Sequence, residues 1–218
     1  MKPYYQDASV TIYHGDCREV SVPSNCAVVT DPPYGMRWNT DSTRFSGGKH
    51  KRGDGRSDYG AIAGDAVGFD PTPWLAFPSV VLWGANHFAS ALPVGTWLVW
   101  IKKHDHLFGT FLSDAELAWS KGGHGVYAMK RSFPPPSRAK EAGAFGVHPT
   151  QKPLALMRWC IESRTVDETV LDPYMGSGTT LVSAKSIGRT AIGIEVDERY
   201  CEIAARRCSQ ETMDLGAA

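Results

Sequence analysis

The sequence lacks the features that would assign it to several common protein classes. Its 23 basic and 23 acidic side chains give a formal net charge of zero, so the chain as a whole does not attract a polyanion. No apolar run could span a bilayer and no signal peptide is recognisable, which predicts a cytoplasmic protein without membrane contact. The five cysteines form no Cys-x-x-Cys pair, so we expect reduced thiols and no metal site.

Charge is unevenly distributed despite the zero total. The segment 37–56 has six basic residues and two acidic ones, and the segment 129–140 has four basic residues and no acid. Such segments can line a basic groove for nucleic acid, or they can be ordinary solvated loops. The two histidines of His104-Asp105-His106 could suggest a metal, but the pattern is more typical of a solvated turn.

Short apolar stretches alternate with amphipathic ones along the chain. Strands alternating with helices predict an α/β fold with a doubly wound, mostly parallel sheet. The long segment 35–70, rich in Gly, Ser and Arg, is expected to be a functional loop. Strands are expected at 10–13, 27–30, 79–83, 96–101, 115–120, 169–172 and 190–195, and helices at 86–92, 151–164, 179–187 and 198–209.

The segment Asp31-Pro32-Pro33-Tyr34 follows a buried strand directly. Its prolines fix φ and have no N–H, so they leave carbonyl acceptors beside the carboxylate. The ring can stack on a flat heterocycle while these acceptors bind an exocyclic amino group. The pattern therefore favours chemistry on an amino nitrogen of a nucleobase, although an Asp-Pro pair can also be a simple turn.

A second segment, DPYMGSGTT at 172–180, joins a strand to a helix through Gly176 and Gly178. It has Leu181 where a dinucleotide-binding turn has its third glycine, and it lacks the lysine of a P-loop. Ser177 or Thr179 can cap the helix that follows. The next strand ends at Glu195, where an acid can bind both ribose hydroxyls. A ribose-binding acid without a phosphate cradle favours S-adenosylmethionine, with ordinary turn glycines as the alternative.

A third segment, His148-Pro149-Thr150-Gln151-Lys152-Pro153, precedes an expected helix. Free backbone N–H groups at a helix start, with the Thr and Lys side chains, suit a carboxylate such as that of methionine. A helix start with proline in its first turn is the alternative.

Together these segments resemble the amino-group DNA methyltransferases, which modify adenine N6 or cytosine N4. The catalytic motif matches at 31–34, the cofactor turn at 172–180, the ribose acid at Glu195 and the helix-start motif at 148–153. The catalytic motif comes first and the cofactor turn near the end, as in the circularly permuted β-type enzymes. The resemblance spans residues 10 to about 205, and the middle section is short compared with related restriction-modification enzymes.

The resemblance implies one methyltransferase domain over 1–218, with DNA-contacting loops at 35–70 and 130–147 and a possible homodimer. Asp31, Pro32, Pro33 and Tyr34 would be catalytic. The implied cofactor-binding residues are Asp16, Asp31, His148, Thr150, Gln151, Lys152, Asp172, Pro173, Gly176, Ser177, Gly178, Thr179, Glu195 and Asp197. The DNA-binding candidates, chosen for charge and for one loop tryptophan, are Arg37, Trp38, Arg44, Lys49, Lys51, Arg52, Lys130 and Arg131.

The implied reaction is methyl transfer from S-adenosylmethionine to adenine N6 of a base flipped out of double-stranded DNA. Within the resemblance, aspartate at the first catalytic position favours adenine over cytosine. Three alternatives stay open: cytosine N4, an amino group in RNA or a protein amide, and a non-catalytic subunit that binds DNA or cofactor.

Overall fold

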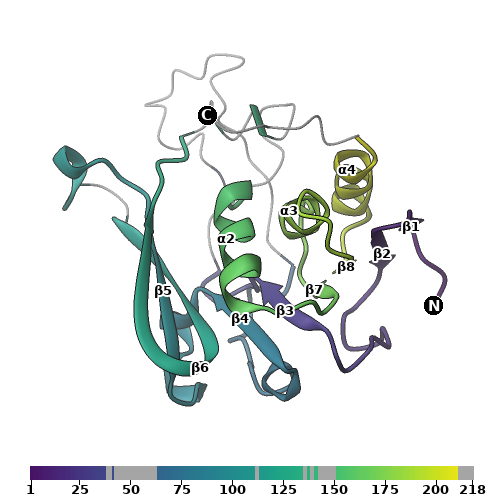
Figure 1. Cartoon of the computed structure of the whole chain (residues 1–218), viewed down its shortest axis with the longest axis horizontal. Coiled ribbons are helices and arrows are strands. Elements are labelled where there is room, and N and C mark those ends of the chain that lie inside the picture. The colour runs from purple at the N-terminus through teal and green to yellow at the C-terminus, as the bar shows by residue number, and fades with distance from the viewer. Residues whose placement is uncertain are drawn as a thin grey trace.

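A computed structural model describes residues 1–37, 41, 63–110, 113–134, 137, 140–141 and 151–210. One mixed sheet of eight strands organises these residues, in the order β1-β2-β8-β7-β3-β4-β6-β5. Helices α2, α3 and α4 lie on one face of it (Figure 1). The α/β fold with a mostly parallel sheet, predicted from the sequence, is confirmed.

The bounds of the elements follow the apolar runs of the sequence. The strands are β1 (Tyr5–Gln6), β2 (Val10–His14), β3 (Ala27–Thr30), β4 (Ser79–Trp83), β5 (Gly95–Ile101), β6 (Ala115–Lys130), β7 (Val170–Asp172) and β8 (Ala191–Glu195). The α-helices are α2 (Leu154–Arg164), α3 (Thr179–Lys185) and α4 (Glu198–Ser209). Short 3-10 turns lie at Trp74–Ala76, Ala85–His87, Ala89–Ala91 and Asp105–Leu107.

The central strands β2, β8, β7, β3 and β4 are parallel, so their carboxyl ends meet at one edge of the sheet. In register, Val28 of β3 lies opposite Leu171 of β7 and Val80 of β4. Residue 28 is 143 positions from its β7 partner, so the sheet itself joins the two motif-bearing segments.

Alternate residues of the buried strands face two different cores. Val29 and Val81 face the α-helices and contribute to a cluster with Leu156, Ile161 and Leu181. Their neighbours face the other side, where the cover comes from 3-10 turns and loops rather than α-helices; this second cluster includes Val28, Val80, Leu82, Trp74 and Phe88. Burial on both faces explains why these strands are continuous apolar runs.

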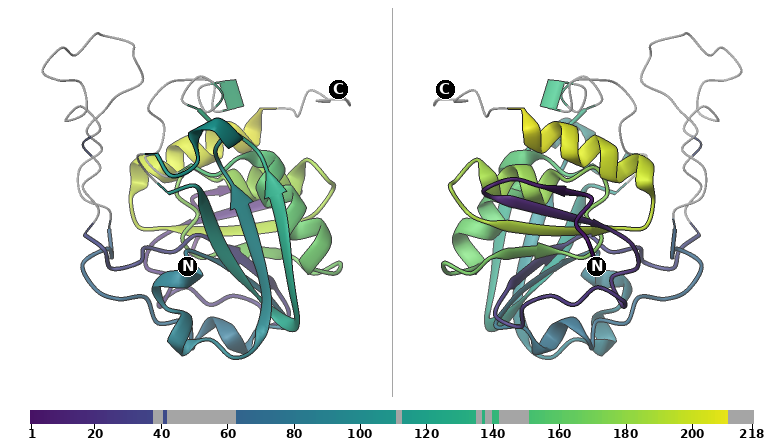
Figure 2. Two further views of the ribbon diagram at one scale, coloured as in Figure 1. Left: turned by 90° about the vertical axis from the view of Figure 1, so that its left-hand side faces the viewer. Right: turned by 90° about the vertical axis from the view of Figure 1, so that its right-hand side faces the viewer.

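Helix α4 lies along β2 and β8 at one side of the sheet (Figure 2, right). Its start is capped by Asp197, whose carboxylate accepts a hydrogen bond from the Arg199 amide at 2.9 Å. No helix among the described residues is long and apolar enough to cross a membrane.

Three expected elements differ from the observed ones. The region expected as a helix at 86–92 forms two 3-10 turns, and α2 begins at Leu154 because Pro153 is extended, with ψ 141°. The strand expected at 115–120 continues to Lys130. It passes along both edges of β5, since Leu98 lies opposite both Ala118 and Tyr127.

Candidate active site

Four neighbouring strands have an acidic residue at or just after their ends, at the same edge of the sheet. Asp31 follows β3, Asp172 ends β7, Glu195 ends β8, and Asp16 comes two residues after the end of β2. At about 4.8 Å between neighbouring strands, this row of carboxylates is roughly 14 Å long. The edge therefore offers acceptors over the length of a small nucleoside.

The catalytic segment and the glycine turn meet where β3 lies beside β7. The Thr30 hydroxyl donates to Asp172 Oδ1 at 2.6 Å, and the Tyr174 amide donates to the same oxygen at 3.2 Å. Asp172 is 3% exposed, and burial raises its pKa to about 6 against the hydrogen bonds that lower it. This contact is the structural link between the first and last motifs of the chain.

The Asp31 carboxylate has a hydrogen-bond donor on each oxygen. The Tyr34 hydroxyl donates to Oδ1 and the Lys152 ammonium donates to Oδ2. Burial raises the pKa of Asp31, while Lys152 acts in the opposite direction. Lys152 also lies 3.1 Å from Glu116 Oε2, so its ammonium bridges two carboxylates.

The Tyr34 ring stacks on His87, with 4.8 Å between the ring centroids and 16° between the planes. One face of the ring is therefore covered by the protein. Gly84, at φ +69°, makes room for the ring, because a Cβ there would lie 1.9 Å from Tyr34 Cε1. The sequence analysis missed both Gly84 and His87; the only signal was a glycine at the exit of β4.

A backbone clasp holds the chain just after the catalytic segment. Buried Asp65 accepts hydrogen bonds from the amides of Gly35 at 2.8 Å and Met36 at 3.0 Å, and its carbonyl accepts one from the Arg37 amide. Sequence reasoning missed Asp65, which lies in a segment without periodicity.

The glycine turn closes around Glu195. The Gly176 amide donates to Glu195 Oε2 at 3.0 Å and the Asp197 amide donates to Oε1 at 2.9 Å, while burial raises the Glu195 pKa. Gly178, at φ +77°, lies so close to α4 that a Cβ would be 2.7 Å from the Ala204 Cβ. Gly178 is therefore required by the local packing, and Pro173 between β7 and the turn is buried.

Ser177 and Thr179 face α4 instead of capping α3. Arg207 Nη1 donates to the Ser177 carbonyl at 2.6 Å, to Ser177 Oγ at 3.1 Å and to Thr179 Oγ1 at 3.2 Å. No side chain caps α3, so the expected capping role is wrong. Arg207, which the sequence analysis did not single out, supports the turn from behind.

The remaining acids have partners of their own. Asp16 pairs with Arg18, which lowers the pKa of Asp16 to about 2. Asp197 caps α4, which gives it a structural role whether or not it meets a ligand.

The helix-start motif is only partly within the described residues. His148 and Thr150 lie outside them. Gln151 is 5% exposed, and its Nε2 has no hydrogen-bond partner. Lys152 belongs to the Asp31 cluster, so its ammonium faces carboxylates of the protein.

The residues predicted to contact DNA also lie only partly within the described residues. Arg37 is exposed with a positive φ of 52°, and Lys130 and Arg131 follow one another at the end of β6. Lys130 pairs with Asp105, and Arg131 Nη2 lies 3.8 Å from Glu141. The other candidates lie outside the described residues: Trp38, Arg44, Lys49, Lys51 and Arg52.

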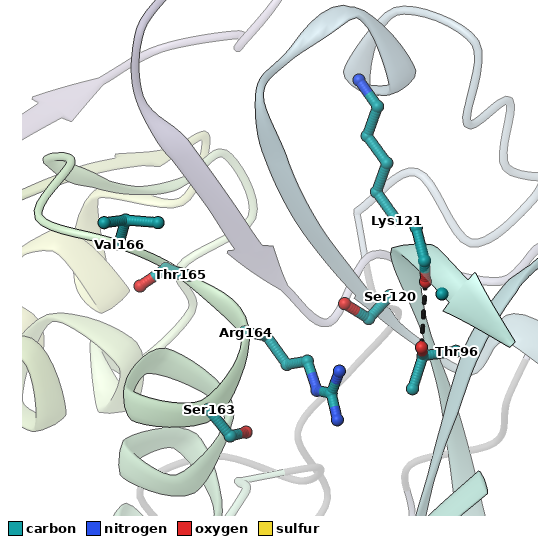
Figure 3. Close-up of a pocket in the computed structure, with 9 residues that line it drawn as sticks. Thr96, Ser120, Lys121, Ser163, Arg164, Thr165 and Val166 are labelled. Carbon is teal, nitrogen blue, oxygen red and sulfur yellow. Dashed lines mark hydrogen bonds between the residues drawn. The ribbon is translucent and has the colours of Figure 1, made fainter. Parts of the chain in front are cut away.

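One further cavity of about 340 Å³ lies between the start of β5, the bend in β6 and the end of α2. Figure 3 shows Arg164 extending toward Thr96 and Ser120 in this cavity. None of the predicted site residues lines it. Among the described residues, no group of three or more His, Cys, Asp or Glu side chains could hold a metal ion.

Comparison with known proteins agrees with this arrangement. Residues 99–206 match the family model described as DNA methylase. The chain is 33% identical over 117 residues to the Type II methyltransferase M2.MboI of Moraxella bovis, an alignment that covers 53% of this chain and 41% of that protein. The chain thus spans less than half the length of this curated relative.

Solved structures share the fold at lower identity. The M1.HpyAVI–SAM complex has a TM-score of 0.55 and 23% identity over 91% of this chain and 99% of its own. The PvuII DNA methyltransferase (cytosine-N4-specific) has a TM-score of 0.60 and 16% identity over 100% of this chain and 91% of its own. In the family match and the shared fold, the chain is similar to the amino-group DNA methyltransferases, and the order of its motifs fits that similarity.

Proposed function

We propose that this chain transfers a methyl group from S-adenosylmethionine to an amino nitrogen of DNA, with adenine N6 as the acceptor. The observation that carries the proposal is the contact between β3 and β7. The hydrogen bond from Thr30 to Asp172 holds the Asp31 segment beside the glycine turn, so an amino acceptor and a cofactor can meet there. The match to the family model described as DNA methylase supports the choice of DNA.

The residues at the sheet edge fit the cofactor. Glu195 follows a parallel strand, where its carboxylate can accept from two ribose hydroxyls. The buried and unpartnered Gln151 Nε2 is a donor that a bound carboxylate or carbonyl would satisfy. Asp16 and Asp172 would flank the adenosine and methionine ends. Bound there, S-adenosylmethionine supplies a methyl group on a positively charged sulfur.

The protein's own contribution is positioning. An adenine amino group is a weak nucleophile because its lone pair is delocalised into the ring. Hydrogen bonds from N6 to Asp31 and to the Pro32 carbonyl would favour a pyramidal nitrogen with its lone pair directed at the methyl carbon. Alignment alone can supply a large part of the rate, and Asp31 receives the proton only as the new bond forms.

The target base must leave the DNA stack for this geometry to form. His87 covers one face of Tyr34, and the proposal assigns the other face to stacking on the extruded ring. The basic residues near the ends of β5 and β6 would bind phosphates. Double-stranded DNA as partner, a homodimer and a cytoplasmic location belong to the same proposal, as do the single-domain organisation and the DNA-contacting loops.

The test is methyl transfer by the purified chain, with methyl-labelled cofactor and separate pools of DNA, RNA and protein. We expect label in DNA, recovered as N6-methyladenine after digestion to nucleosides. Asp31→Ala and the isosteric Asp31→Asn should keep cofactor affinity and lose transfer by about 100-fold or more. An active Asp31→Ala variant would contradict the role of Asp31. Label recovered as N4-methylcytosine would show that the acceptor is cytosine N4 instead of adenine N6. Absence of label from DNA would overturn the proposal.

A further inference from the structure

Around Lys152 lies a chain of four alternating charges. Its ammonium donates to Asp31 Oδ2 and lies 3.1 Å from Glu116 Oε2. On the far side, Lys102 donates to Glu116 Oε1 at 2.8 Å. Lys152 is 6% exposed, so this ammonium is held almost entirely by the protein. Neither Glu116 nor Lys102 lies in the segments 31–34, 148–153 or 172–180.

The arrangement places Lys152 where it weakens Asp31 as an acceptor. A carboxylate whose charge is balanced by a directly bonded ammonium attracts a neutral amino group less strongly. Without the ammonium nearby, however, burial would favour the neutral form of Asp31, which accepts poorly. Methyl transfer therefore needs Lys152 close to Asp31 but no longer bonded to it.

Glu116 offers the ammonium a second position. Glu116 Oε2 is buried and lies 3.1 Å from Lys152 Nζ, as an ion pair outside good hydrogen-bond geometry. A small rotation of the ammonium would bring this contact into hydrogen-bond geometry. Burial alone would raise the pKa of Glu116, but Lys152 and Lys102 overcome it and hold that pKa at about 2, so Glu116 stays charged.

We infer that Glu116 is a positioning residue that takes the Lys152 ammonium from Asp31 when the amino group of the target base arrives. Asp31 is then charged and free to accept a hydrogen bond from that amino group. Lys102 holds the opposite oxygen of Glu116 and so fixes its direction. The inference rests on the proposed function, because it assigns a step in the same site.

The experiment compares Glu116→Gln with the wild-type chain in steady-state methylation of DNA between pH 5 and pH 9. Without the second carboxylate, Lys152 stays on Asp31. We expect kcat on the plateau to fall about tenfold or more, with the KM for DNA and the cofactor affinity within twofold of wild type. The acid limb of the profile should move to lower pH, because Asp31 loses a negative neighbour.

Lys102→Met gives a second variant with the opposite sign. Its side chain is about one quarter exposed, so the substitution should be tolerated. Glu116 then attracts Lys152 more strongly and adds an uncompensated negative charge near Asp31. The acid limb should move to higher pH by about one unit. Glu202→Gln, which removes an exposed ion pair with Arg206, is the matched control and should leave the profile unchanged.

The outcomes separate the inference from the proposed function. Suppose that the wild type is active. The role of Glu116 is then overturned, and the function is kept, by either of two results. One is a kcat plateau of Glu116→Gln within twofold of wild type, and the other is an acid limb that does not move in opposite directions in the two variants. If Glu116→Gln does not fold, the direction of the Lys102→Met shift decides, and an unmoved acid limb there overturns the inference. An inactive wild-type chain overturns both.

Discussion

At the scale of single residues, Asp172 is a buried acid whose hydrogen-bond donors, the Thr30 hydroxyl and the Tyr174 amide among them, are neutral. Its raised pKa of about 6 means that the folded protein takes up a proton which the unfolded chain, near 3.8, does not. For a raised pKa, the stabilising contribution is complete below the unfolded value and is lost as the pH rises through the folded one. Burial of this carboxylate therefore destabilises the folded protein most at neutral pH, where the group is charged.

The predicted consequence concerns Asp172→Asn, which mimics the protonated acid and keeps an acceptor for Thr30. Between pH 7 and pH 5 the wild type should gain about 1 kcal/mol of unfolding free energy that the variant does not gain. Denaturant unfolding at both pH values measures it. Equal pH trends in the two proteins would contradict the assignment of the proton to Asp172.

Asp7 provides a control of opposite sign. Although burial raises its pKa, hydrogen bonds from Lys185, Ser9 and Val10 leave that pKa well below its usual range. A lowered pKa gives stability above the unfolded value that is lost as the pH falls. The stability deficit of Asp7→Asn should therefore shrink as the solution is acidified toward pH 3.

Gly84 controls the position of Tyr34. A Cβ at Gly84 would overlap the tyrosine ring, so Gly84→Ala should displace the hydroxyl from Asp31 and lower kcat by about tenfold or more. Gly188 is the matched control, because its φ of +74° carries the same backbone strain but its Cβ would meet nothing within 4 Å. Gly188→Ala should cost only the strain, about 1–2 kcal/mol, and leave kcat intact. Equal activities in the two variants would contradict the role of Gly84.

At the scale of elements, the Asp65 clasp joins the end of the catalytic segment to a distant loop. Asp65→Ala removes the acceptor of two partly buried backbone amides, which should cost about 1 kcal/mol of unfolding free energy. Because the clasp fixes Gly35, next to Tyr34, kcat should fall further than stability alone explains. Asp70→Ala, which removes an exposed acceptor of the Thr72 amide, is the control. Melting curves and kcat are measured for both variants. If Asp65→Ala lowers the melting temperature but leaves kcat unchanged, the clasp contributes to stability only.

The strands that sequence reasoning located well are those buried on both faces. The apolar runs 27–30 and 79–83 coincide with β3 and β4. A strand that is buried on both faces is apolar at every position, so its bounds can be read from the sequence. The second half of β6 escaped prediction, since its exposed, glycine-rich sequence is specified by pairing with β5. The β-propensity of the residues alone cannot predict such a pairing.

The candidate site was predictable as motifs and not as contacts. The acids at the strand ends followed from the order of parallel strands, but the partner of Asp31 lies 121 residues away, at Lys152. Glu116 carried one weak signal, a lone acid at the start of an otherwise apolar strand. Its ion pairs with Lys102 and Lys152 arise only when three segments meet.

At the scale of the whole molecule, the proposed function requires a chain without net charge to bind a polyanion. Basic side chains gather near the ends of β5 and β6: Lys102 reaches the Asp31 cluster through Glu116, and Lys130 lies opposite Ile101, the residue before Lys102. Several of these cations are partly balanced by acids, as Lys130 is by Asp105. Under the proposed function, DNA would therefore compete with carboxylates of the protein for these side chains.

This competition predicts opposite effects for the two members of one exposed pair. Lys130→Gln should weaken binding to all DNA sequences alike and reduce the slope of log affinity against log salt by about 1, because one phosphate contact is lost. Asp105→Asn, whose side chain is 80% exposed, should strengthen binding at low salt, since Lys130 is then free for phosphate. Arg206→Gln on α4 is the control and should change neither quantity. Titrations with labelled duplex at several salt concentrations measure the affinities of all three variants. An unchanged slope in Lys130→Gln would show that the end of β6 does not contact DNA.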